Sequence, residues 1–396
     1  MANVSSSNGL EKRPKLRFPG FDEPWQSTLL SSVFTKNTKK NTDGRITNVI
    51  CNSAKQGLMP QREYFDKDIA NSDNTSGYYI IEENDFVYNP RKSADAPYGP
   101  ISRYKYAEAG IVSPLYLCFR AKKEINPSFF EWYFRSSAWH RYVYMSGDSG
   151  ARHDRVSIKD DTFFAMPINL PSAHEQEHIA SFLERIDQRI EKQRALVESL
   201  KKYKRGLVKA LISGTVAFAC SENKRWETVR LAEIFTISAG GDIDRQNSSP
   251  TYSTSYPYPV YANALTNNGL YGYANYFKVE GDSITVSGRG EVGHAIARHC
   301  KYVPIVRLLS LVPKYEDDVD FFAYMINATS IYIESTGVPQ LTSPQLGAVK
   351  VFRPPILEQK RISSLLLKID AKIENEERLT FYLEKIRSSM LQQLFI

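Results

Sequence analysis

The sequence predicts a mixed α+β protein in which two globular blocks alternate with two long helices that pair with each other, so that one chain forms a pseudo-twofold molecule. A segment that begins at Glu175 returns at Glu358, 183 residues later, and the two copies align without a gap. Each copy carries apolar residues at alternating spacings of four and three, which is the template of a coiled-coil helix. The blocks before the two copies also open alike, at Trp25 and Trp226.

Each long helix is predicted to begin just after a proline, Pro171 or Pro354, because proline is tolerated in a first helical turn. The seam lasts for more than four heptads in both copies. Two polar seam positions in each copy, Gln193 and Lys204 or Glu376 and Arg387, are expected to fix the register of the pair. The apolar seam positions are Ile179, Leu183, Ile186, Ile190, Val197, Leu200, Leu207 and Leu211 in the first helix, and Ile362, Leu366, Ile369, Ile373, Leu383, Met390 and Leu394 in the second.

The composition limits the class of protein. The 396 residues are 42% hydrophobic, which is enough for two or three domains with their own cores. No run of 18 apolar residues occurs, so no transmembrane helix is expected. The four cysteines are far apart and form no C-x-x-C pair, which favours a reducing cytoplasm over a disulfide framework or a zinc site. The net charge of +7 is compatible with a nucleic-acid partner but does not by itself indicate one.

This pattern divides the chain into five parts. Residues 1–14, rich in serine and asparagine, are expected to form a disordered leader, and residues 15–170 the first globular block. Residues 171–221 hold the first long helix and a linker. Residues 222–353 form the second globular block, and residues 354–396 form the second long helix.

In the first block, short apolar or alternating runs predict strands at residues 78–81, 85–88 and 113–119. Pro127 opens an aromatic-rich pattern that predicts one helix over residues 128–145. A glycine-containing loop follows this helix.

In the second block, the same reasoning predicts strands at residues 283–287, 294–298 and 304–313 and a helix at residues 319–334. Each block therefore ends in the same order: strands, a helix, a loop with glycine, a strand, a proline and the long helix. This order indicates two copies of one mixed α+β architecture.

Two motifs resemble a metal site and a cofactor site, but the context of each argues against that interpretation. Residues 174–178 (HEQEH) match the zinc motif H-E-x-x-H, yet the second copy of the helix has no histidine in this register. Residues 288–293 (GRGEVG) match the dinucleotide fingerprint G-x-G-x-x-G, but an alternating pattern follows where a helix is required. We therefore expect a basic hairpin at the second motif, and no catalytic, cofactor or metal site in this chain.

The predicted loops of both blocks carry side chains that suit DNA. Arginine, asparagine and glutamine make paired hydrogen bonds to base edges, and lysine or arginine neutralises phosphate. For each residue the alternative is a solvated loop side chain without a partner. The DNA-contact candidates are Arg91, Lys92, Arg103, Lys105, Arg152, His153 and Arg155 in the first block, and Arg245, Tyr252, Tyr256, Tyr258, Arg289, His294, Arg298 and Gln340 in the second.

On these features the chain resembles the specificity subunits of type I restriction–modification systems. The resemblance covers nearly the whole chain. It rests above all on the duplicated helix that alternates with two dissimilar blocks. It rests also on the opening at residues 16–25 (LRFPGFDEPW) and on the runs at residues 86–90 (FVYNP) and 110–116 (GIVSPLY).

The resemblance implies that each globular block is a target recognition domain that reads one half of a split site in double-stranded DNA. The long helices would pack antiparallel and set the spacing between the half-sites. Two modification subunits, which are methyltransferases, would dock on the chain, and restriction subunits that act as translocases and nucleases would join for cleavage. The chain itself would be a non-catalytic cytoplasmic subunit without a cofactor, with S-adenosylmethionine, ATP and Mg²⁺ bound by the partner subunits.

Two alternatives stay open on the sequence. The first is the specificity subunit of a related methyltransferase or restriction system outside type I. The second is a coiled-coil adaptor whose globular blocks bind proteins. DNA affinity and its salt dependence separate the adaptor from a DNA reader, because phosphate neutralisation makes affinity fall steeply as the salt concentration rises.

Overall fold

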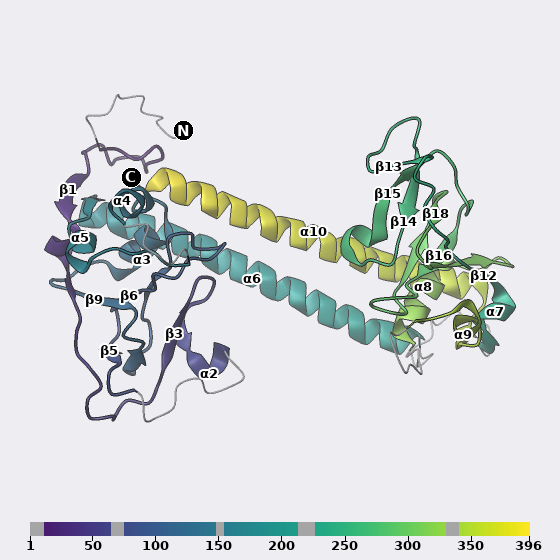
Figure 1. The fold of residues 1–396 in the computed structure, drawn as a ribbon, viewed down its shortest axis with the longest axis horizontal. Coiled ribbons are helices and arrows are strands. Elements are labelled where there is room, and N and C mark those ends of the chain that lie inside the picture. The colour runs from purple at the N-terminus through teal and green to yellow at the C-terminus, as the bar shows by residue number, and fades with distance from the viewer. Residues whose placement is uncertain (1–11, 65–74, 148–153, 213–225, 330–339) are drawn as a thin grey trace. The chain divides into compact units, whose positions relative to one another are not determined.

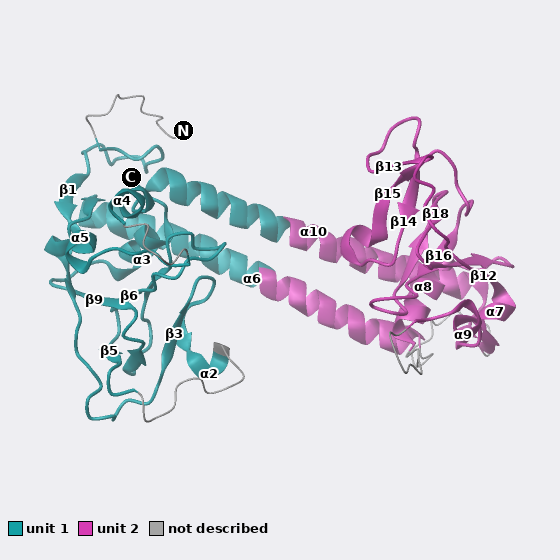
Figure 2. Ribbon diagram, viewed as in Figure 1, with its two compact units in different colours: residues 1–193, 379–396 teal, residues 194–378 magenta. Residues whose placement is uncertain are grey.

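The structure is a computed structural model that describes residues 12–64, 75–147, 154–212, 226–329 and 340–396. The chain forms two compact units, and each unit takes part of both long helices (Figure 1). Figure 2 shows unit 1, which consists of residues 1–193 and 379–396, and unit 2, which consists of residues 194–378. Both units are mixed α+β, as predicted. Within the described ranges, no helix is long and apolar enough to cross a membrane.

Unit 1 begins with a strand, a single helical turn and a second strand, and its last strand leads into the first long helix. Its elements are β1 (Gln26–Leu29), α1 (Leu30–Val33), β2 (Phe34–Lys36), β3 (Ile50–Ser53), β4 (Gly57–Pro60), α2 (Gln61–Tyr64), β5 (Tyr79–Ile81), β6 (Phe86–Tyr88), β7 (Ile101–Arg103), β8 (Gly110–Val112), β9 (Leu117–Ala121), α3 (Pro127–Arg135), α4 (His140–Ser146), α5 (Asp160–Phe164), β10 (Pro167–Leu170) and the first part of α6 (Ala173–Ile212).

Unit 2 repeats this opening and this ending. Its elements are β11 (Glu227–Arg230), α7 (Leu231–Ile234), β12 (Phe235–Ala239), β13 (Ser248–Ser249), β14 (Tyr258–Tyr261), the 3-10 helix η2 (Thr266–Gly269), β15 (Leu270–Ala274), β16 (Ser283–Val286), β17 (Ala295–Arg298), β18 (Val303–Pro304), β19 (Leu309–Pro313), α8 (Val319–Ala328), α9 (Ser343–Gly347), β20 (Lys350–Arg353) and the first part of α10 (Ile356–Leu394).

The two units share one sheet topology. In unit 1 four antiparallel strands pair in the order β2-β9-β6-β7, and in unit 2 the order is β12-β19-β16-β17. In each unit a separate antiparallel pair joins the first strand to the strand before the long helix, β1 with β10 or β11 with β20. The same pairing in two dissimilar sequences confirms the predicted internal repeat.

Helices α3 and α8 pack on these sheets and are capped in the same way. The Asn126 side chain accepts a hydrogen bond from the backbone N–H of Phe129 at 2.9 Å, and the Asp318 side chain accepts one from Phe321 at 2.8 Å. Such caps satisfy a backbone donor that the first helical turn leaves unpaired. Phe129 and Phe321 are both fully buried, so each cap sets an aromatic residue into the core of its unit.

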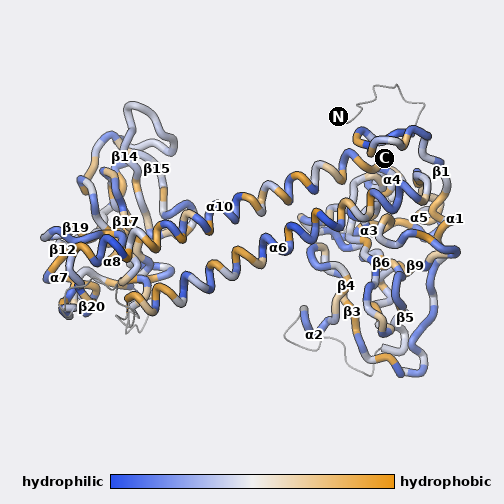
Figure 3. The backbone as a smooth tube through the Cα atoms, turned by 180° about the vertical axis from the view of Figure 1, so that it is seen from behind, coloured by the Kyte–Doolittle hydropathy of each residue, from blue (hydrophilic) through white to orange (hydrophobic). Residues whose placement is uncertain are grey.

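Helices α6 and α10 run antiparallel within each unit. In unit 2, Lys201 lies 2.9 Å from Glu377, while Lys204, three residues further along α6, lies 2.5 Å from Asp370, seven residues back along α10. In unit 1 the first turns of α6 and the last turns of α10 share one hydrophobic core. The apolar seam positions named above are all buried or half-buried. Figure 3 shows hydrophobic and hydrophilic residues alternating along both helices.

The core of unit 1 is completed by a residue that follows α10. Phe395 is 5% exposed. Its ring lies 5.5 Å from the ring of Phe129, 6.1 Å from Tyr133 and 6.5 Å from Trp25, measured between centroids. Aromatic pairs at these separations add to the stabilisation that burial provides. The Trp25 ring also lies 6.2 Å from that of Phe129, so Trp25 packs against both α3 and the residue that follows α10.

The predicted single helix over residues 128–145 is wrong. Helix α3 ends at Arg135 and α4 begins at His140. The Ser136 hydroxyl donates to the carbonyl of Tyr133 at 2.6 Å and accepts from the backbone N–H of Ala138 at 3.2 Å. Serine competes in this way for the backbone groups that would continue a helix.

The predicted strand over residues 113–119 is also wrong at its start. The chain leaves β8 at Val112 and enters β9 only at Leu117. Between them, the Tyr116 N–H donates to the Ser113 carbonyl at 3.0 Å, which closes a turn around Pro114. Proline pre-sets the backbone angle of such a turn.

The predicted strand over residues 304–313 is interrupted. Val306 and Arg307 have φ angles of +52° and +61°, and the Leu308 N–H donates to the Ile305 carbonyl at 3.0 Å. This turn separates β18 from β19. The predicted strands at residues 78–81, 85–88, 283–287 and 294–298 are confirmed to within one residue at each end.

The outer limits of several predictions lie outside the described residues. Helix α8 ends at Ala328, and the last part of the helix predicted over residues 319–334 is not described. Most of the predicted leader and the linker after α6 are also outside the described ranges. The predicted domain limits therefore stay predictions.

Candidate nucleic-acid interface

In unit 1 the loop between β6 and β7 is joined to the segment that precedes α5. The backbone N–H of Val156 donates to the Pro90 carbonyl at 2.9 Å. Beside this bond, Arg91 pairs with Arg155 as an isolated antiparallel β-bridge. Arg91 and Lys92 are exposed, and Arg155 is half-buried. The structure thus brings three of the predicted DNA-contact candidates onto one edge of unit 1.

A buried polar network supports the base of this loop. Asn52 is 6% exposed, its amide donates to the Val87 carbonyl at 2.8 Å, and its side-chain oxygen accepts from the Ser102 hydroxyl at 2.7 Å. The Asn89 amide donates to the Asn52 carbonyl at 3.2 Å, and the Asn89 side-chain oxygen accepts from the Arg91 N–H at 3.1 Å. Satisfied networks of this kind rigidify the backbone that they join.

In unit 2 the loop between β16 and β17 is joined to the segment before α9 in the same way. The Leu341 N–H donates to the Gly288 carbonyl at 2.9 Å, and the Gly288 N–H donates to the Asn263 side-chain oxygen at 2.8 Å. A Cβ atom at position 288 would lie 2.8 Å from the backbone oxygen of Arg307. Only glycine permits this close approach of two backbones.

The side chain that follows Gly288 is held at the surface. The Arg289 Nε and Nη2 atoms donate to the Gln340 side-chain oxygen at 3.3 Å and 3.0 Å. Arg289 is exposed, and Gln340 is half-buried. The antiparallel pairing of β16 with β17 around this loop confirms the predicted hairpin.

Two neighbouring loops of unit 2 contain residues that the sequence reasoning missed. Val306 and Arg307 are exposed and have positive φ angles, and the Asn263 amide donates to the Val306 carbonyl. Asn267 and Asn268 are exposed, each with a φ angle of +51°. Strained backbone of this kind is concentrated at functional sites. The Asn-Asn-Gly triplet at residues 267–269 is a turn signal in the sequence, but Val306 and Arg307 carry no such signal.

Two other candidates of unit 1 share one acidic partner. Arg103 is 3.7 Å from Glu131 and donates to the Ser128 hydroxyl at 3.1 Å, and Lys105 is 2.7 Å from Glu131. The Arg103 side chain is 17% exposed, whereas that of Lys105 is 59% exposed. Lys105 is therefore the more exposed of the two side chains and the better candidate for a contact with DNA. Arg152 and His153 lie outside the described residues.

The tyrosine candidates of unit 2 lie in and beside the sheet β13-β15-β14-β18. Tyr252 is 63% exposed, and its ring packs edge-on against Tyr273 at 5.5 Å. Tyr258 packs against Phe277 at 5.1 Å, and Tyr256 is half-buried. Sequence reasoning missed Tyr273, although it stands in the same tyrosine-rich stretch.

The remaining candidates of unit 2 differ in exposure. Arg245 and His294 are exposed, but Arg298 is only 7% exposed. The Arg298 guanidinium lies 3.6 Å from the centre of the Tyr261 ring and donates to the Thr285 hydroxyl at 2.9 Å. Burial lowers the pKa of Arg298 below its ordinary value, although the nearby tyrosine partly opposes this shift. This guanidinium is used inside the unit and is not presented to a ligand.

The HEQEH motif is a structural feature at the start of α6. The Glu175 carboxylate is 1% exposed and forms a two-pronged ion pair with Arg17, with both N···O distances at 2.8 Å. The His174 ring lies 5.6 Å from the Phe21 ring, and the His178 Nδ1 atom lies 3.0 Å from the His174 carbonyl. Among the described residues, no group of three or more His, Cys, Asp or Glu side chains is placed to hold a metal ion.

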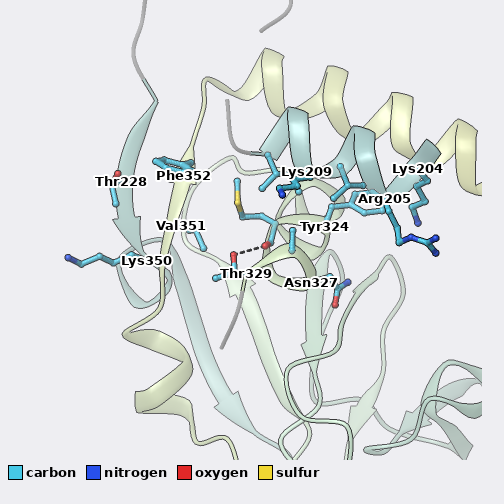
Figure 4. A pocket seen from close by; sticks show the side chains of 14 residues that line it. Lys204, Arg205, Lys209, Thr228, Tyr324, Asn327, Thr329, Lys350, Val351 and Phe352 are labelled. Atoms are coloured by element: carbon cyan, nitrogen blue, oxygen red, sulfur yellow. Dashed lines mark hydrogen bonds between the residues drawn. The ribbon is translucent and has the colours of Figure 1, made fainter. Parts of the chain in front are cut away.

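Unit 2 also contains a pocket of about 780 Å³ between α6, α8, β11 and β20 (Figure 4). Both apolar and basic side chains line it. The apolar lining residues include Val208, Met325 and Phe352, and the basic ones include Arg205, Lys209 and Lys350. A pocket with apolar and basic lining residues suits an acidic protein segment that carries an apolar anchor residue.

Large apolar side chains are exposed on the outer faces of the long helices. In unit 1, α10 presents Phe381, Tyr382 and Ile386, which are 53%, 58% and 47% exposed. In unit 2, α6 presents Leu196 and Tyr203, which are 42% and 60% exposed. None of the five is a seam residue. Clustered exposed apolar side chains indicate a protein contact surface.

Comparison with known proteins gives a single family. Residues 23–201 and 223–385 match the family model described as the type I restriction modification DNA specificity domain. The chain is 25% identical over 246 residues to a Mycoplasma pneumoniae protein named as a type I specificity subunit, a match that covers 62% of this chain and 64% of that protein. It is 27% identical over 260 residues to a Methanocaldococcus jannaschii protein named as a type I restriction enzyme specificity subunit, covering 61% of each. The chain thus spans less than two thirds of the length of these relatives.

Solved structures show the same fold. The S subunit of a type I restriction–modification system from M. genitalium superposes with a TM-score of 0.56 at 16% identity, covering 97% of this chain and 99% of that one. A chain from a structural study of complex assembly in the type I R-M system gives a TM-score of 0.63 at 17% identity, covering 94% and 97%. These likenesses confirm the predicted fold class.

Proposed function

Because the chain belongs to the family of type I restriction modification DNA specificity domains, we propose that it is the DNA-recognition subunit of such a system and that each globular domain reads one half of a split site. The observation that carries the proposal is one scaffold that occurs twice and presents different loop side chains. Arg91 stands beside Arg155 in unit 1, and Arg289 stands beside Gln340 in unit 2. A reader of two unlike half-sites needs a repeated scaffold for position and two surfaces for base contacts.

In this proposal the paired helices set the spacing between the half-sites. Both α6 and α10 are continuous helices, of 40 and 39 residues, and each contributes to both units. Protein geometry fixes half-site spacing in other DNA readers in the same manner. The ion pairs between α6 and α10 support a fixed register of the two helices.

Two modification subunits are the proposed partners of the helices and recognition domains. The exposed apolar residues of the long helices and the pocket of unit 2, which has basic lining residues, support this part of the proposal. The double variant Arg205→Glu with Lys209→Glu is expected to reduce co-purification of the modification subunit. Lys278→Glu is the matched control, because Lys278 is exposed in the same unit and does not line the pocket. Equal recovery from both variants would argue against docking at this pocket.

The chemistry is assigned to partner subunits. Methyl transfer would use S-adenosylmethionine bound by the modification subunits, and translocation and cleavage would use ATP and Mg²⁺ bound by the restriction subunits. This chain would supply sequence recognition and geometry, acting in the cytoplasm on double-stranded DNA.

Methylome sequencing tests the proposal directly. Cells that express this chain with its cognate modification subunit are expected to gain a new split motif with methylated adenine. If both subunits are soluble and associated but no new motif is found, a coiled-coil adaptor that binds proteins becomes the better reading. A salt titration of DNA binding then separates the two, because only a phosphate-neutralising reader loses affinity steeply with salt.

A further inference from the structure

Arg91 and Arg289 occupy the same place in the two units. Each is the third residue after the strand that opens the hairpin, β6 in unit 1 and β16 in unit 2. In both units the residue before the arginine accepts a backbone hydrogen bond at 2.9 Å from the segment that leads to α5 or α9. The sequences of the two hairpins differ in length and composition, but this attachment and the arginine recur.

Both arginines stand on a rigid base and reach the surface. The Arg91 N–H is bound by the Asn89 side chain, and the Asn89 amide is tied in turn to Asn52. The Arg289 guanidinium turns its Nε–Nη2 edge to Gln340. Within the described ranges, Nη1 and the second hydrogen of Nη2 have no protein partner, so this end of the Arg289 guanidinium can donate outward. A side chain that is oriented by its own supporting contacts binds with less loss of rotamer freedom.

The chemistry of the free end points to one base. A guanidinium donates two parallel hydrogen bonds, and guanine presents two adjacent acceptors, O6 and N7, in the major groove. Arginine paired with guanine is the commonest specific contact between protein and DNA. Gln340 does not need to touch DNA in this scheme, since it holds the guanidinium in place.

We infer that Arg91 and Arg289 are the equivalent base-reading residues of the two domains, each contacting a guanine in the major groove of its own half-site. Gln340 is a positioning residue for Arg289. This inference rests on the proposed function and deepens it. The inference requires a guanine in each half-site and assigns one arginine to each of these guanines.

The test uses the full chain assembled with its modification subunits. The complex selects from a library of random DNA duplexes, and the bound duplexes are sequenced. Arg289→Ala is expected to lower the preference for guanine at one position of one half-site by about 10- to 100-fold and to leave the other half-site unchanged. Arg91→Ala is expected to do the same in the other half-site. Lys278→Ala in unit 2 and Lys122→Ala in unit 1 are matched controls, because both residues are exposed cations outside the two hairpins.

Two further variants keep the test decisive if an alanine variant does not assemble. Arg289→Lys keeps the positive charge but lacks the planar fork, so it is expected to retain DNA binding and to lose most of the guanine preference. Gln340→Ala is expected to weaken guanine preference at the same position as Arg289→Ala and at no other. Loss of Gln340 for a purely structural reason would instead lower binding of all sequences alike.

The outcomes separate the inference from the proposed function. If the unaltered complex selects a split motif and the arginine variants keep their guanine preference, the inference is wrong and the proposed function stands. A uniform loss of affinity across the library, with a smaller salt slope, would show a phosphate contact and would also overturn the inference. If the unaltered complex selects no split motif, the proposed function itself fails.

Discussion

Lys204 on α6 lies 2.5 Å from Asp370 on α10 in unit 2, and the repeat places an equivalent pair, Arg387 with Asp187, in unit 1. In unit 2 the Tyr324 hydroxyl also donates to Asp370 at 2.5 Å. The polar seam positions that the heptad pattern shows at Lys204 and Arg387 thus carry an interhelical ion pair in each unit. Polar seam residues lower stability relative to an apolar seam but select one register.

Loss of the unit 1 ion pair is expected to destabilise that unit. Burial alone would raise the pKa of Asp187, but Arg135 and Arg387 outweigh burial and hold this pKa below its ordinary value. Asp187→Asn removes the negative charge and one of the two oxygens that accept from Arg135 and Arg387, and it is expected to lower the free energy of unfolding by about 1–3 kcal/mol. Urea denaturation at neutral pH measures the change, with the exposed Glu184→Gln as control.

The effect of Asp187→Asn on stability is expected to depend on pH. A carboxylate with a lowered folded-state pKa stabilises the fold above its unfolded pKa and loses that contribution as the pH falls through the folded-state pKa. The stability difference between the unaltered protein and Asp187→Asn is therefore expected to shrink below about pH 4. A difference that stays constant down to pH 3 would contradict an ionic role for Asp187.

Truncation of Phe395 is expected to open a cavity in the core of unit 1. Phe395→Ala removes a 5% exposed ring that packs against Trp25, Phe129 and Tyr133. Substitutions of this kind typically cost about 3–5 kcal/mol of stability. Thermal unfolding followed by tryptophan fluorescence measures the loss. Phe381→Ala, which removes a 53% exposed ring from α10, the helix that precedes Phe395, is expected to change stability by less than about 0.5 kcal/mol.

Arg298 and Arg289 are expected to behave in opposite ways. Arg298→Ala removes a buried guanidinium and its contacts with Tyr261 and Thr285, which should lower the stability of unit 2 by about 2–3 kcal/mol. Its folded fraction should keep the base preference of the unaltered protein. Arg289→Ala should leave the melting temperature unchanged. Calorimetry together with duplex selection checks both halves of this prediction, and a changed motif with Arg298→Ala would refute it.

His299 is expected to make the stability of unit 2 depend on pH. Its Nδ1 lies 2.8 Å from Asp282 and its Nε2 lies 3.1 Å from Asp320. Burial works against the charged ring, but the hydrogen bonds to the two carboxylates outweigh burial and raise the pKa of His299. A raised pKa gives stabilisation that is fully present below the unfolded pKa of about 6.5 and is lost as the pH rises through the folded-state pKa.

His299→Gln should therefore reduce the melting temperature more at pH 5.5 than at pH 8.5. The exposed His294→Gln serves as the control variant of the same residue type. An equal reduction at the two pH values would show that packing, and not charge, accounts for the role of His299.

Lengthening both long helices is expected to change the spacer of the DNA site and to preserve its two half-sites. Seven residues inserted at matching seam positions of α6 and α10 add about 10 Å at 1.5 Å per residue, on the order of three base pairs. Methylome sequencing of cells that express the lengthened chain with its modification subunit reads the result. Methylation by the lengthened protein at sites with the original spacer length would contradict the proposal that the helices set the spacing between the half-sites.

Features with a local signal could be predicted from the sequence. The long helices follow from a duplicated segment and a heptad pattern that persists through about 40 residues, so single ambiguous residues do not alter the result. The breaks inside shorter helices and strands are harder to predict from the sequence. The turn at Val306 and Arg307 is held by Asn263, 43 residues earlier in the chain, and nothing in the local sequence indicates it.

The candidate interface was predictable by residue type but not by environment. Arg91 and Arg289 stand in loops, as their glycine- and proline-containing neighbours suggested. Arg298 shares their residue type, but Tyr261 and Thr285 from other strands enclose it. Long-range strand pairing decides which arginine is buried, and a single sequence does not reveal that pairing.

The packing of Trp25 against Phe395 has a consequence for biosynthesis. Unit 2 consists of one unbroken stretch, residues 194–378, whereas unit 1 needs residues 379–396 in addition to the first 193. As the chain leaves the ribosome, the rings of unit 1 that pack against Phe395 stay uncovered until the end of α10 and the residue after it have been translated. All residues of unit 2 are therefore translated before unit 1 is complete. Once unit 2 has folded, it shortens the effective loop between the two segments of unit 1, and unit 1 closes last. Maturation thus runs against the order of translation, and a chain stalled before Phe395 would present an open aromatic core to chaperones and proteases.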